Sequence, residues 1–239
     1  MNIDDIKTIA VIGAGDMGHG IAEVALIAGY KVFLRDINQE FVDKGVGRIN
    51  ASLEKLVAKG KVPAEHFDKI KSELMVPCTD LEEAVKAADL VIEAIPELMD
   101  LKKETFKIMD AAAPDHTIFA SNTSTMKITE IASATNRPEK VLGLHYFNPA
   151  VIMKLVEVIK GDKTTDETMQ IGYDFVNKIS KVPVKVHKDV PGFIVNRVQA
   201  PSGVLLGCFL DKQIAEPEAV DAIFRNMGSP MGPYETMDY

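Results

Sequence analysis

The sequence contains few cysteines and no long apolar run. Its two cysteines, Cys78 and Cys208, lie far apart, so neither a disulfide framework nor a metal-binding spacing is present. We therefore expect no metal site, and such sparse cysteine suits a reducing compartment. No apolar stretch approaches the length of a membrane span, and the N-terminal residues carry no basic leader. The sequence thus predicts a cytoplasmic protein with no membrane partner.

Basic residues are also scarce. The 239 residues include 27 lysines and arginines against 35 aspartates and glutamates, which gives a formal net charge of −8. Non-specific nucleic-acid binding needs a basic face, so we expect no nucleic-acid partner. The rest of the composition, 46% hydrophobic and 26% charged residues, is that of an ordinary globular protein. The length allows one large or two smaller domains.

A glycine-rich segment near the N-terminus predicts a dinucleotide site. A buried strand over 8–12 is followed by a turn and a helical pattern. Gly13 permits the tight turn, Gly15 lets the backbone approach a pyrophosphate, and Gly18 lets the helix pack closely on the strand. Amides at the helix start would face the phosphates. The predicted cofactor-binding turn comprises Gly13, Ala14, Gly15, Asp16, Met17 and Gly18.

An acidic residue ends the second predicted strand. Asp36 lies 18 residues after Gly18, where a carboxylate can accept hydrogen bonds from the adenosine ribose. Because it would also repel a 2′-phosphate, the sequence predicts NAD as the cofactor, although the neighbouring Arg35 leaves NADP open. Asp16 could cap the helix, but its carboxylate would lie close to phosphate if it pointed inward.

Strand and helix patterns alternate along most of the chain, which predicts an α/β fold of Rossmann type with a doubly wound, mostly parallel sheet. Within 39–72, two helical patterns are split by Gly60–Pro63 and predict a helical-hairpin insertion. The predicted strands are 8–12, 31–35, 73–76, 89–93, 117–120, 140–146, 153–159 and 182–187.

The pattern changes after Val186. We expect residues 1–187 to form the NAD-binding domain and 188–239 to begin an all-helical second domain, with helices through about Leu210 and over 217–227. Two helices leave much apolar surface uncovered. We therefore expect a partner chain, or sequence absent here, to cover this surface.

A histidine and a glutamate on successive predicted strands are the candidate catalytic pair. His145 falls near the carboxyl end of its strand, where open α/β sheets bind ligands. A histidine can take the proton of an alcohol while hydride leaves the same carbon. If the two strands pair, Glu157 would fix the tautomer and stabilise the imidazolium. The competing readings are a hydrogen-bonded core histidine and an edge-strand glutamate that faces solvent.

Further polar residues follow the strands at the same edge. Asn122, Ser124 and Asn148 can polarise a carbonyl or hold a carboxamide, although Ser124 or Thr125 could equally cap a helix. Glu97 and Lys102 follow the 89–93 strand. Their simpler interpretation is that of solvated charges in the first turn of a helix.

Six motifs together resemble the L-3-hydroxyacyl-CoA dehydrogenase family, particularly its short bacterial 3-hydroxybutyryl-CoA dehydrogenases. The resemblance runs from about Lys7 to Tyr239 and implies reversible, NAD-linked oxidation of an (S)-3-hydroxyacyl-CoA to the 3-ketoacyl-CoA, as used in fatty-acid and butyrate metabolism. The motifs are Gly-Ala-Gly-Asp-Met-Gly (13–18), Ser-Asn-Thr-Ser (121–124), His-Tyr-Phe-Asn-Pro (145–149), Met-Lys-Leu-Val-Glu-Val-Ile (153–159), Pro-Gly-Phe-Ile-Val-Asn-Arg (191–197) and Pro-Met-Gly-Pro (230–233).

The resemblance also implies roles for individual residues. His145 matches the general base, and Glu157 matches its orienting acid. Ser124 matches a substrate contact, and Asn196 matches the asparagine that supports the acyl group from the second domain. Residues matched to the nicotinamide half of the cofactor are Glu97, Lys102 and Asn148, and those matched to coenzyme A are Ser52 and Lys59. The family forms homodimers through the second domain.

Two departures from the family pattern bear on that domain. Pro201 and Gly203 fall inside an expected helix, which a proline kinks or shortens. Family chains also continue for a few dozen residues past Tyr239, so the second domain is expected to be truncated. Two alternatives stay open: a 3-hydroxyisobutyrate-type dehydrogenase, which uses a catalytic lysine, and a non-catalytic or inactive relative that binds NADH without turnover.

Overall fold

The computed structural model describes residues 1–229 and 231–237 of the chain. The chain divides into two compact units, Met1–Phe193 and Ile194–Tyr239, and each is described by itself. The assignment of a cofactor role to one domain and a substrate role to the other stays a prediction.

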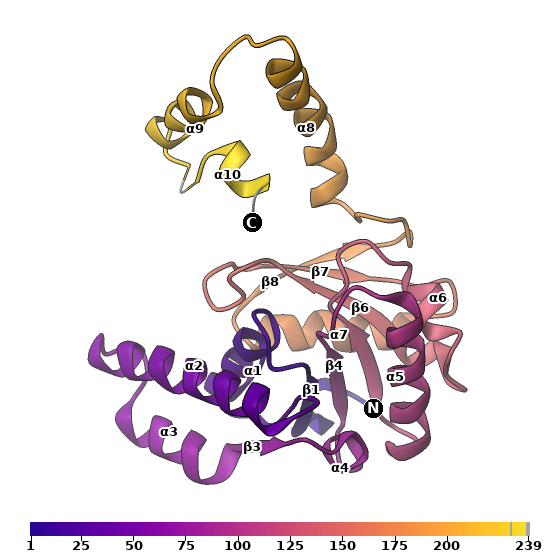
Figure 1. Ribbon diagram of the computed structural model, residues 1–239. Helices are drawn as coiled ribbons and strands as arrows, with labels where there is room; N and C mark the ends of the chain where they lie inside the picture. The colour runs from indigo at the N-terminus through magenta and orange to yellow at the C-terminus, as the bar shows by residue number, and fades with distance from the viewer. Residues whose placement is uncertain (230, 238–239) are drawn as a thin grey trace. The chain divides into compact units, whose positions relative to one another are not determined.

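The first unit is built on one eight-stranded sheet in the order β3-β2-β1-β4-β5-β6-β7-β8 (Figure 1). Neighbouring strands are parallel except for β6 and β7, which pair antiparallel. The predicted mostly parallel, doubly wound sheet is confirmed. The strands are β1 (Thr8–Ile12), β2 (Lys31–Arg35), β3 (Met75–Cys78), β4 (Leu90–Glu93), β5 (Ile118–Ser121), β6 (Val141–Tyr146), β7 (Leu155–Ile159) and β8 (Val182–Val186).

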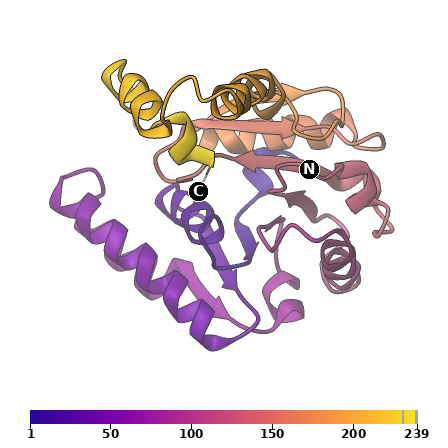
Figure 2. The same ribbon diagram turned by 45° about the horizontal axis from the view of Figure 1, so that its top comes forward.

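Helices cover both faces of this sheet and enclose two apolar cores. One core joins the strands to α1, α2 and α7, and the other joins them to α4, α5 and α6. Figure 2 shows the sheet between helical layers. The helices are α1 (Gly18–Ile27), α2 (Gln39–Ala58), α3 (Ala64–Lys69), α4 (Leu81–Val85), α5 (Met99–Ala112), α6 (Ile128–Ala132) and α7 (Asp166–Lys178), with short turns η1 (Ile3–Asp5), η2 (Ile70–Leu74, π-helical) and η3 (Pro138–Lys140).

The predicted helical hairpin is α2 with α3, drawn in purple in Figure 1. The Asn38 side chain caps α2 by accepting the Phe41 N–H at 2.9 Å. The helix buries Val42, Ile49 and Leu53 on one face and ends at the Gly60–Pro63 break. At Gly45 it approaches the glycine turn so closely that a Cβ there would lie 2.8 Å from the Ala14 Cβ.

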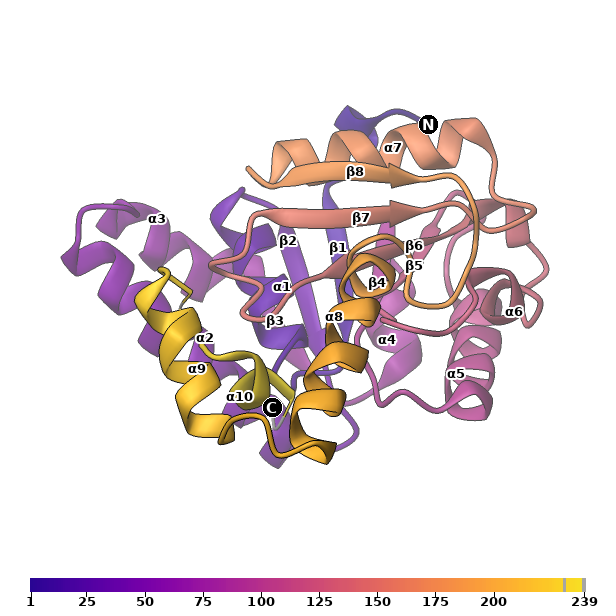
Figure 3. The ribbon, with the colours of Figure 1, turned by 90° about the horizontal axis from the view of Figure 1, so that it is seen from above.

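The register of the strands brings polar residues to one edge of the sheet. Ile12 pairs with Glu93, Glu93 with Ser121, and Ser121 with Gly143. Because β7 runs antiparallel to β6, it places Glu157 opposite His145. Seen from above, β7 and β8 lie side by side beyond β6 (Figure 3).

The second unit contains α8 (Val195–Asp211), α9 (Pro217–Asn226) and α10 (Pro233–Met237). Helix α8 continues through Pro201. The expectation that this proline would shorten the helix is therefore wrong. The Tyr234 hydroxyl donates to the Leu206 carbonyl at 2.8 Å and ties α10 to α8. Sequence reasoning missed α10. The motif residue Pro230 lies outside the described residues.

Candidate active site

The glycine turn after β1 leaves room for a ligand at one point and none at two others. Gly13 has a φ of +105°, and a Cβ there would lie 2.4 Å from the Ala94 carbonyl oxygen. A Cβ on Gly18 would lie 1.8 Å from the Gly13 carbonyl oxygen, whereas one on Gly15 would meet nothing within 4 Å. The turn therefore packs as the motif requires, and its open side is at Gly15. This geometry fits a pyrophosphate.

Asp36 is fixed against the same turn. Its two carboxylate oxygens accept the Ala14 N–H and the Ile37 N–H, each at 2.7 Å. Further lone pairs of this carboxylate can accept ribose hydroxyls. Arg35 donates its Nε–H to the Thr79 carbonyl at 2.9 Å, toward the loop after β3.

Asp16 faces helix α2 instead of capping α1. Its carboxylate forms an ion pair with Arg48 at 2.5 Å. The N-cap residue of α1 is Met17, which makes no side-chain capping bond. The expectation that Asp16 could cap the helix is therefore wrong, since Arg48 binds its carboxylate. The first amides of α1 consequently have no carboxylate cap, which suits an anionic ligand.

His145 and Glu157 form a buried hydrogen-bonded pair. The His145 Nδ1 lies 2.7 Å from the Glu157 Oε2, and the two residues are 4% and 0% exposed. A carboxylate only accepts hydrogen bonds, so we assign the proton to Nδ1, which leaves Nε2 as the acceptor nitrogen. The reading of Glu157 as a solvent-facing glutamate is wrong, since the residue is fully buried, whereas a core histidine satisfied by a hydrogen bond also describes the His145 contact.

Two aromatic rings confine the imidazole. The ring centroids of Phe147 and Phe193 lie 4.6 and 5.7 Å from that of His145. Phe193 is buried although its φ is +46°, a left-handed conformation that a phenylalanine rarely adopts. The preceding Asp189 anchors this segment by accepting the N–H groups of Ile128 and Thr129 at 3.0 and 2.6 Å.

Lys102 is buried in an ion cluster, so the interpretation as a solvated charge is wrong for it. The residue is 1% exposed, and its ammonium lies 2.6 Å from Glu93 and 3.2 Å from Glu97. Sequence reasoning missed Glu93. The available signal was an acidic residue that ends the otherwise apolar strand Leu90–Glu93.

Glu97 connects this cluster to the loop after β5. It accepts hydrogen bonds from the Thr123 hydroxyl and, at 2.8 Å, from the Ser124 N–H. Burial alone raises the pKa of Glu97, but the Thr123 hydrogen bond, the Lys102 charge and the Ser124 amide together hold that pKa below its usual value. Neither Ser124 nor Thr125 caps α6, because the N-cap of that helix is Lys127.

The two asparagines differ in their surroundings. The Asn122 Oδ1 accepts the Tyr146 N–H at 2.9 Å and thereby links the β5 loop to the end of β6. Asn148 is exposed and precedes Pro149.

The two residues matched to coenzyme A contacts lie on α2 and at its C-terminus. Lys59 is the exposed C-cap residue of the helix. The Ser52 hydroxyl donates at 2.6 Å to Glu23 of α1, which is 0% exposed. Burial raises the pKa of Glu23 to about 7, against the hydrogen bond from Ser52 and the charge of Lys181. Asn196 lies in the first turn of α8, in the second unit.

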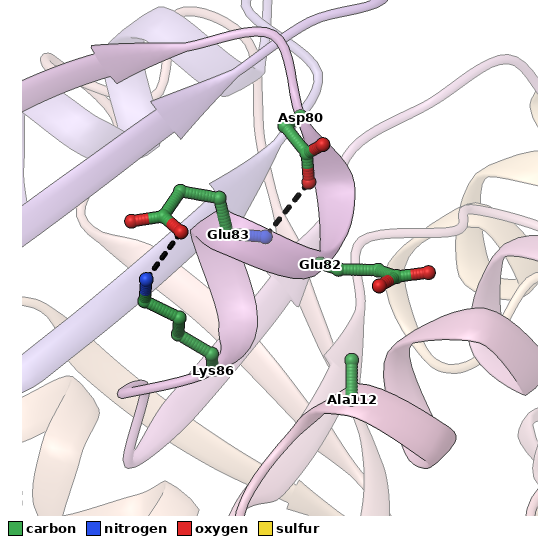
Figure 4. A pocket seen from close by; sticks show the side chains of 5 residues that line it. All are labelled: Asp80, Glu82, Glu83, Lys86 and Ala112. Carbon is green, nitrogen blue, oxygen red and sulfur yellow. Dashed lines mark hydrogen bonds and ion pairs between the residues drawn. The ribbon is translucent and has the colours of Figure 1, made fainter.

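A surface cavity of about 520 Å³ lies away from the candidate residues (Figure 4). Three of its lining side chains are acidic, which does not suit an anionic dinucleotide. It is lined by Asp80, Glu82, Glu83, Lys86 and Ala112. Over residues 1–229 and 231–237, no helix is both long and apolar enough to cross a membrane, and no three His, Cys, Asp or Glu residues group as metal ligands.

The sheet, the glycine turn and the acidic end of β2 define the class of Rossmann-type dinucleotide-binding enzymes. Comparisons with known proteins narrow this class. A sequence profile described as "3-hydroxyacyl-CoA dehydrogenase, NAD binding domain" matches residues 8–190, and the C-terminal domain of the same family matches residues 192–239.

Individual relatives agree with these profiles. The chain is 43% identical over 237 residues to the probable 3-hydroxybutyryl-CoA dehydrogenase of Bacillus subtilis, covering 98% of this chain and 81% of that protein. It is 43% identical over 235 residues to 3-hydroxyadipyl-CoA dehydrogenase of Escherichia coli, covering 98% of this chain but 49% of that protein. A crystal structure of 3-hydroxybutyryl-CoA dehydrogenase from Escherichia coli superposes with a TM-score of 0.89 at 43% identity, with the same two coverages.

The chain therefore belongs to the 3-hydroxyacyl-CoA dehydrogenase family, as the motifs predicted, and its cofactor is NAD. It spans about half the length of the Escherichia coli relative and about four-fifths of that from Bacillus subtilis.

Two alanine substitutions in the glycine turn separate packing from cofactor binding. In Gly18→Ala the new Cβ collides with the Gly13 carbonyl, so we expect unfolding free energy to fall by about 2 to 3 kcal/mol. In Gly15→Ala the Cβ enters open space where phosphate would lie, so we expect unchanged stability but NADH affinity lowered about tenfold or more. Urea unfolding and NADH fluorescence titration measure the two effects, and equal stability loss in both variants would contradict this division.

The buried Glu23 predicts a pH-dependent stability. Its pKa is about 7 when folded against an ordinary value of 4.5, so between these values the folded protein retains a proton that the unfolded chain has lost. Stability therefore falls as pH rises from 4.5 to 7, by about 3 kcal/mol in total. We expect Glu23→Gln to remove this decline and to be the more stable form at pH 8. Urea unfolding at pH 5.5 and 8 tests this, and an unchanged decline in the variant would exclude Glu23 as its source.

Proposed function

We propose that the protein interconverts short-chain (S)-3-hydroxyacyl-CoA and 3-ketoacyl-CoA with NAD as hydride carrier, 3-hydroxybutyryl-CoA and acetoacetyl-CoA being the representative pair. The observation that carries the proposal is the hydrogen bond between His145 Nδ1 and Glu157 Oε2 at the edge of the sheet that also bears the glycine turn. The names of the relatives, 3-hydroxybutyryl-CoA dehydrogenases among them, support the substrate class.

The bound cofactor supplies the acceptor for the hydride that leaves C3 of the alcohol. His145 acts as the base, because its Nδ1 proton is committed to Glu157 and its Nε2 can take the substrate hydroxyl proton. Glu157 is 0% exposed, so its negative charge acts on the developing imidazolium with little screening by solvent. In the reductive direction the same nitrogen returns the proton to the C3 oxygen.

Other residues bind the substrate and the cofactor and orient them. Ser124, placed by the bond from its N–H to Glu97, holds the C3 oxygen, and Asn196 supports the acyl group from the second domain. The exposed ammonium of Lys59, with Ser52 on the same helix, meets coenzyme A phosphates. Asp36 holds the adenosine ribose, while Glu97, Lys102 and Asn148 serve the nicotinamide half.

Neither alternative function is favoured by an observation. A 3-hydroxyisobutyrate-type mechanism needs a reactive lysine, but Lys102 is enclosed by two carboxylates. A non-catalytic relative has no need of a buried His145–Glu157 pair. Homodimerisation through the helical domain and a cytoplasmic location complete the proposal. The exposed apolar side chains of α8 and α9, among them Val204, Leu205 and Ile223, suit such an interface.

Substitution of the base tests the reaction. We expect His145→Gln to lower kcat about a hundredfold or more for NADH oxidation by acetoacetyl-CoA, because no group remains to donate the proton. NADH affinity should stay within about twofold of the wild type, since the glycine turn and Asp36 are untouched. Absorbance at the NADH band measures turnover, and fluorescence titration measures binding. We expect the kcat of Glu157→Gln to lie between those of the wild type and His145→Gln, because the base remains but loses its charged partner.

Lys154→Gln provides the control, since this exposed charge takes no part in the proposed chemistry and should leave turnover unchanged. Normal turnover in His145→Gln would refute the assignment of the base. A wild-type protein that binds NADH but never oxidises it in the presence of acetoacetyl-CoA would be a non-catalytic relative.

A further inference from the structure

The mechanism above gives no role to a fully buried carboxylate at the end of β4. Glu93 is 0% exposed and has three hydrogen-bond donors around it. Its Oε1 accepts the Ile95 N–H at 2.8 Å and the Lys102 ammonium at 2.6 Å, and its Oε2 accepts the Ser121 hydroxyl at 2.7 Å. A carboxylate is costly to bury unless it is paired and hydrogen-bonded, and Glu93 is both.

Glu93 lies next to the predicted cofactor site. In the sheet it pairs with Ile12, which directly precedes the glycine turn, and with Ser121 on the other side. Asp36 lies at the end of β2, on the far side of β1. A dinucleotide whose adenosine end meets Asp36 must therefore extend its other half over β4 and β5, toward His145 on β6.

The cluster carries an excess of one negative charge. It contains two carboxylates, Glu93 and Glu97, and one ammonium, Lys102. Glu97 is the member that reaches solvent, with 38% of its side chain exposed, while the other two are enclosed. Without Glu93, the Lys102 charge would be left to cancel that of Glu97. With Glu93 present, Lys102 is already compensated, and Glu97 keeps its negative charge at the surface of the site.

We propose that Glu93 is a positioning residue that compensates Lys102, so that the net negative cluster makes the site favour the oxidised, cationic nicotinamide over the neutral reduced ring. This inference rests on the proposed function, because it needs the nicotinamide half of NAD to lie over β4 and β5. The oxidised ring differs from the reduced ring by one positive charge, which a nearby negative group stabilises selectively.

The variant Glu93→Gln tests the proposal. Glutamine keeps the shape, and its amide oxygen can still accept from Ile95 and Lys102 while its NH₂ group faces the Ser121 hydroxyl. The cluster then becomes neutral. We expect the Kd for NAD⁺ to rise about fivefold relative to the Kd for NADH, both measured by calorimetry on the full chain. A purely structural role would raise both Kd values by the same factor.

Ser121→Ala is the matched control, because it removes a hydrogen bond to Glu93 without changing charge, and its Kd ratio should equal that of the wild type. Glu97→Gln removes the same charge from a partly exposed position and should shift the ratio in the same direction, even if Glu93→Gln fails to fold. An unchanged ratio in Glu97→Gln, or in a folded Glu93→Gln, overturns the proposal. A wild-type chain that binds neither form of the cofactor overturns the proposed function instead.

Discussion

The antiparallel pairing of β6 with β7 is the constraint on which the candidate chemistry depends. In a wholly parallel sheet, strand ends at the ligand edge present residues that follow each strand, and a base would need a partner from a loop. Here the reversal sets Glu157, a residue from the middle of β7, directly across from His145. Backbone hydrogen bonds of two buried strands therefore fix the geometry of the pair, and a rigid ladder positions side chains more tightly than a loop does.

Much of the fold could be predicted because local sequence patterns, such as apolar runs and turn residues, indicate its strands and helices. Each of the eight predicted strands exists, since buried strands such as Thr8–Ile12 read as short apolar runs between turn residues. The hairpin was equally visible in the Gly60–Pro63 break. The continuation of α8 through Pro201 was not, because the sequence shows the lost amide donor but not that the helix continues past it.

Partner choice within the candidate site was harder to predict. The positions of His145 and Glu157 followed from strand pairing, whereas Asp16 with Arg48 and Lys102 with Glu93 join residues whose proximity no short-range pattern encodes. The simpler interpretation of Lys102 as a solvated charge arose because its partner Glu93 could not be recognised from the sequence. Two of the buried glutamates have different partners: Glu93 faces an ammonium at 2.6 Å, while Glu23 accepts a hydrogen bond from a serine hydroxyl and burial raises its pKa.

Phe193 lies both at the end of the first unit and beside the candidate base. It is the last residue of the first unit, and its ring also lies against the imidazole of His145. Its backbone is left-handed, and the nearby Asp189 anchors the segment that leads to it. A change in the backbone of Phe193 would therefore alter the packing around the imidazole of the candidate base, because the two rings lie against each other.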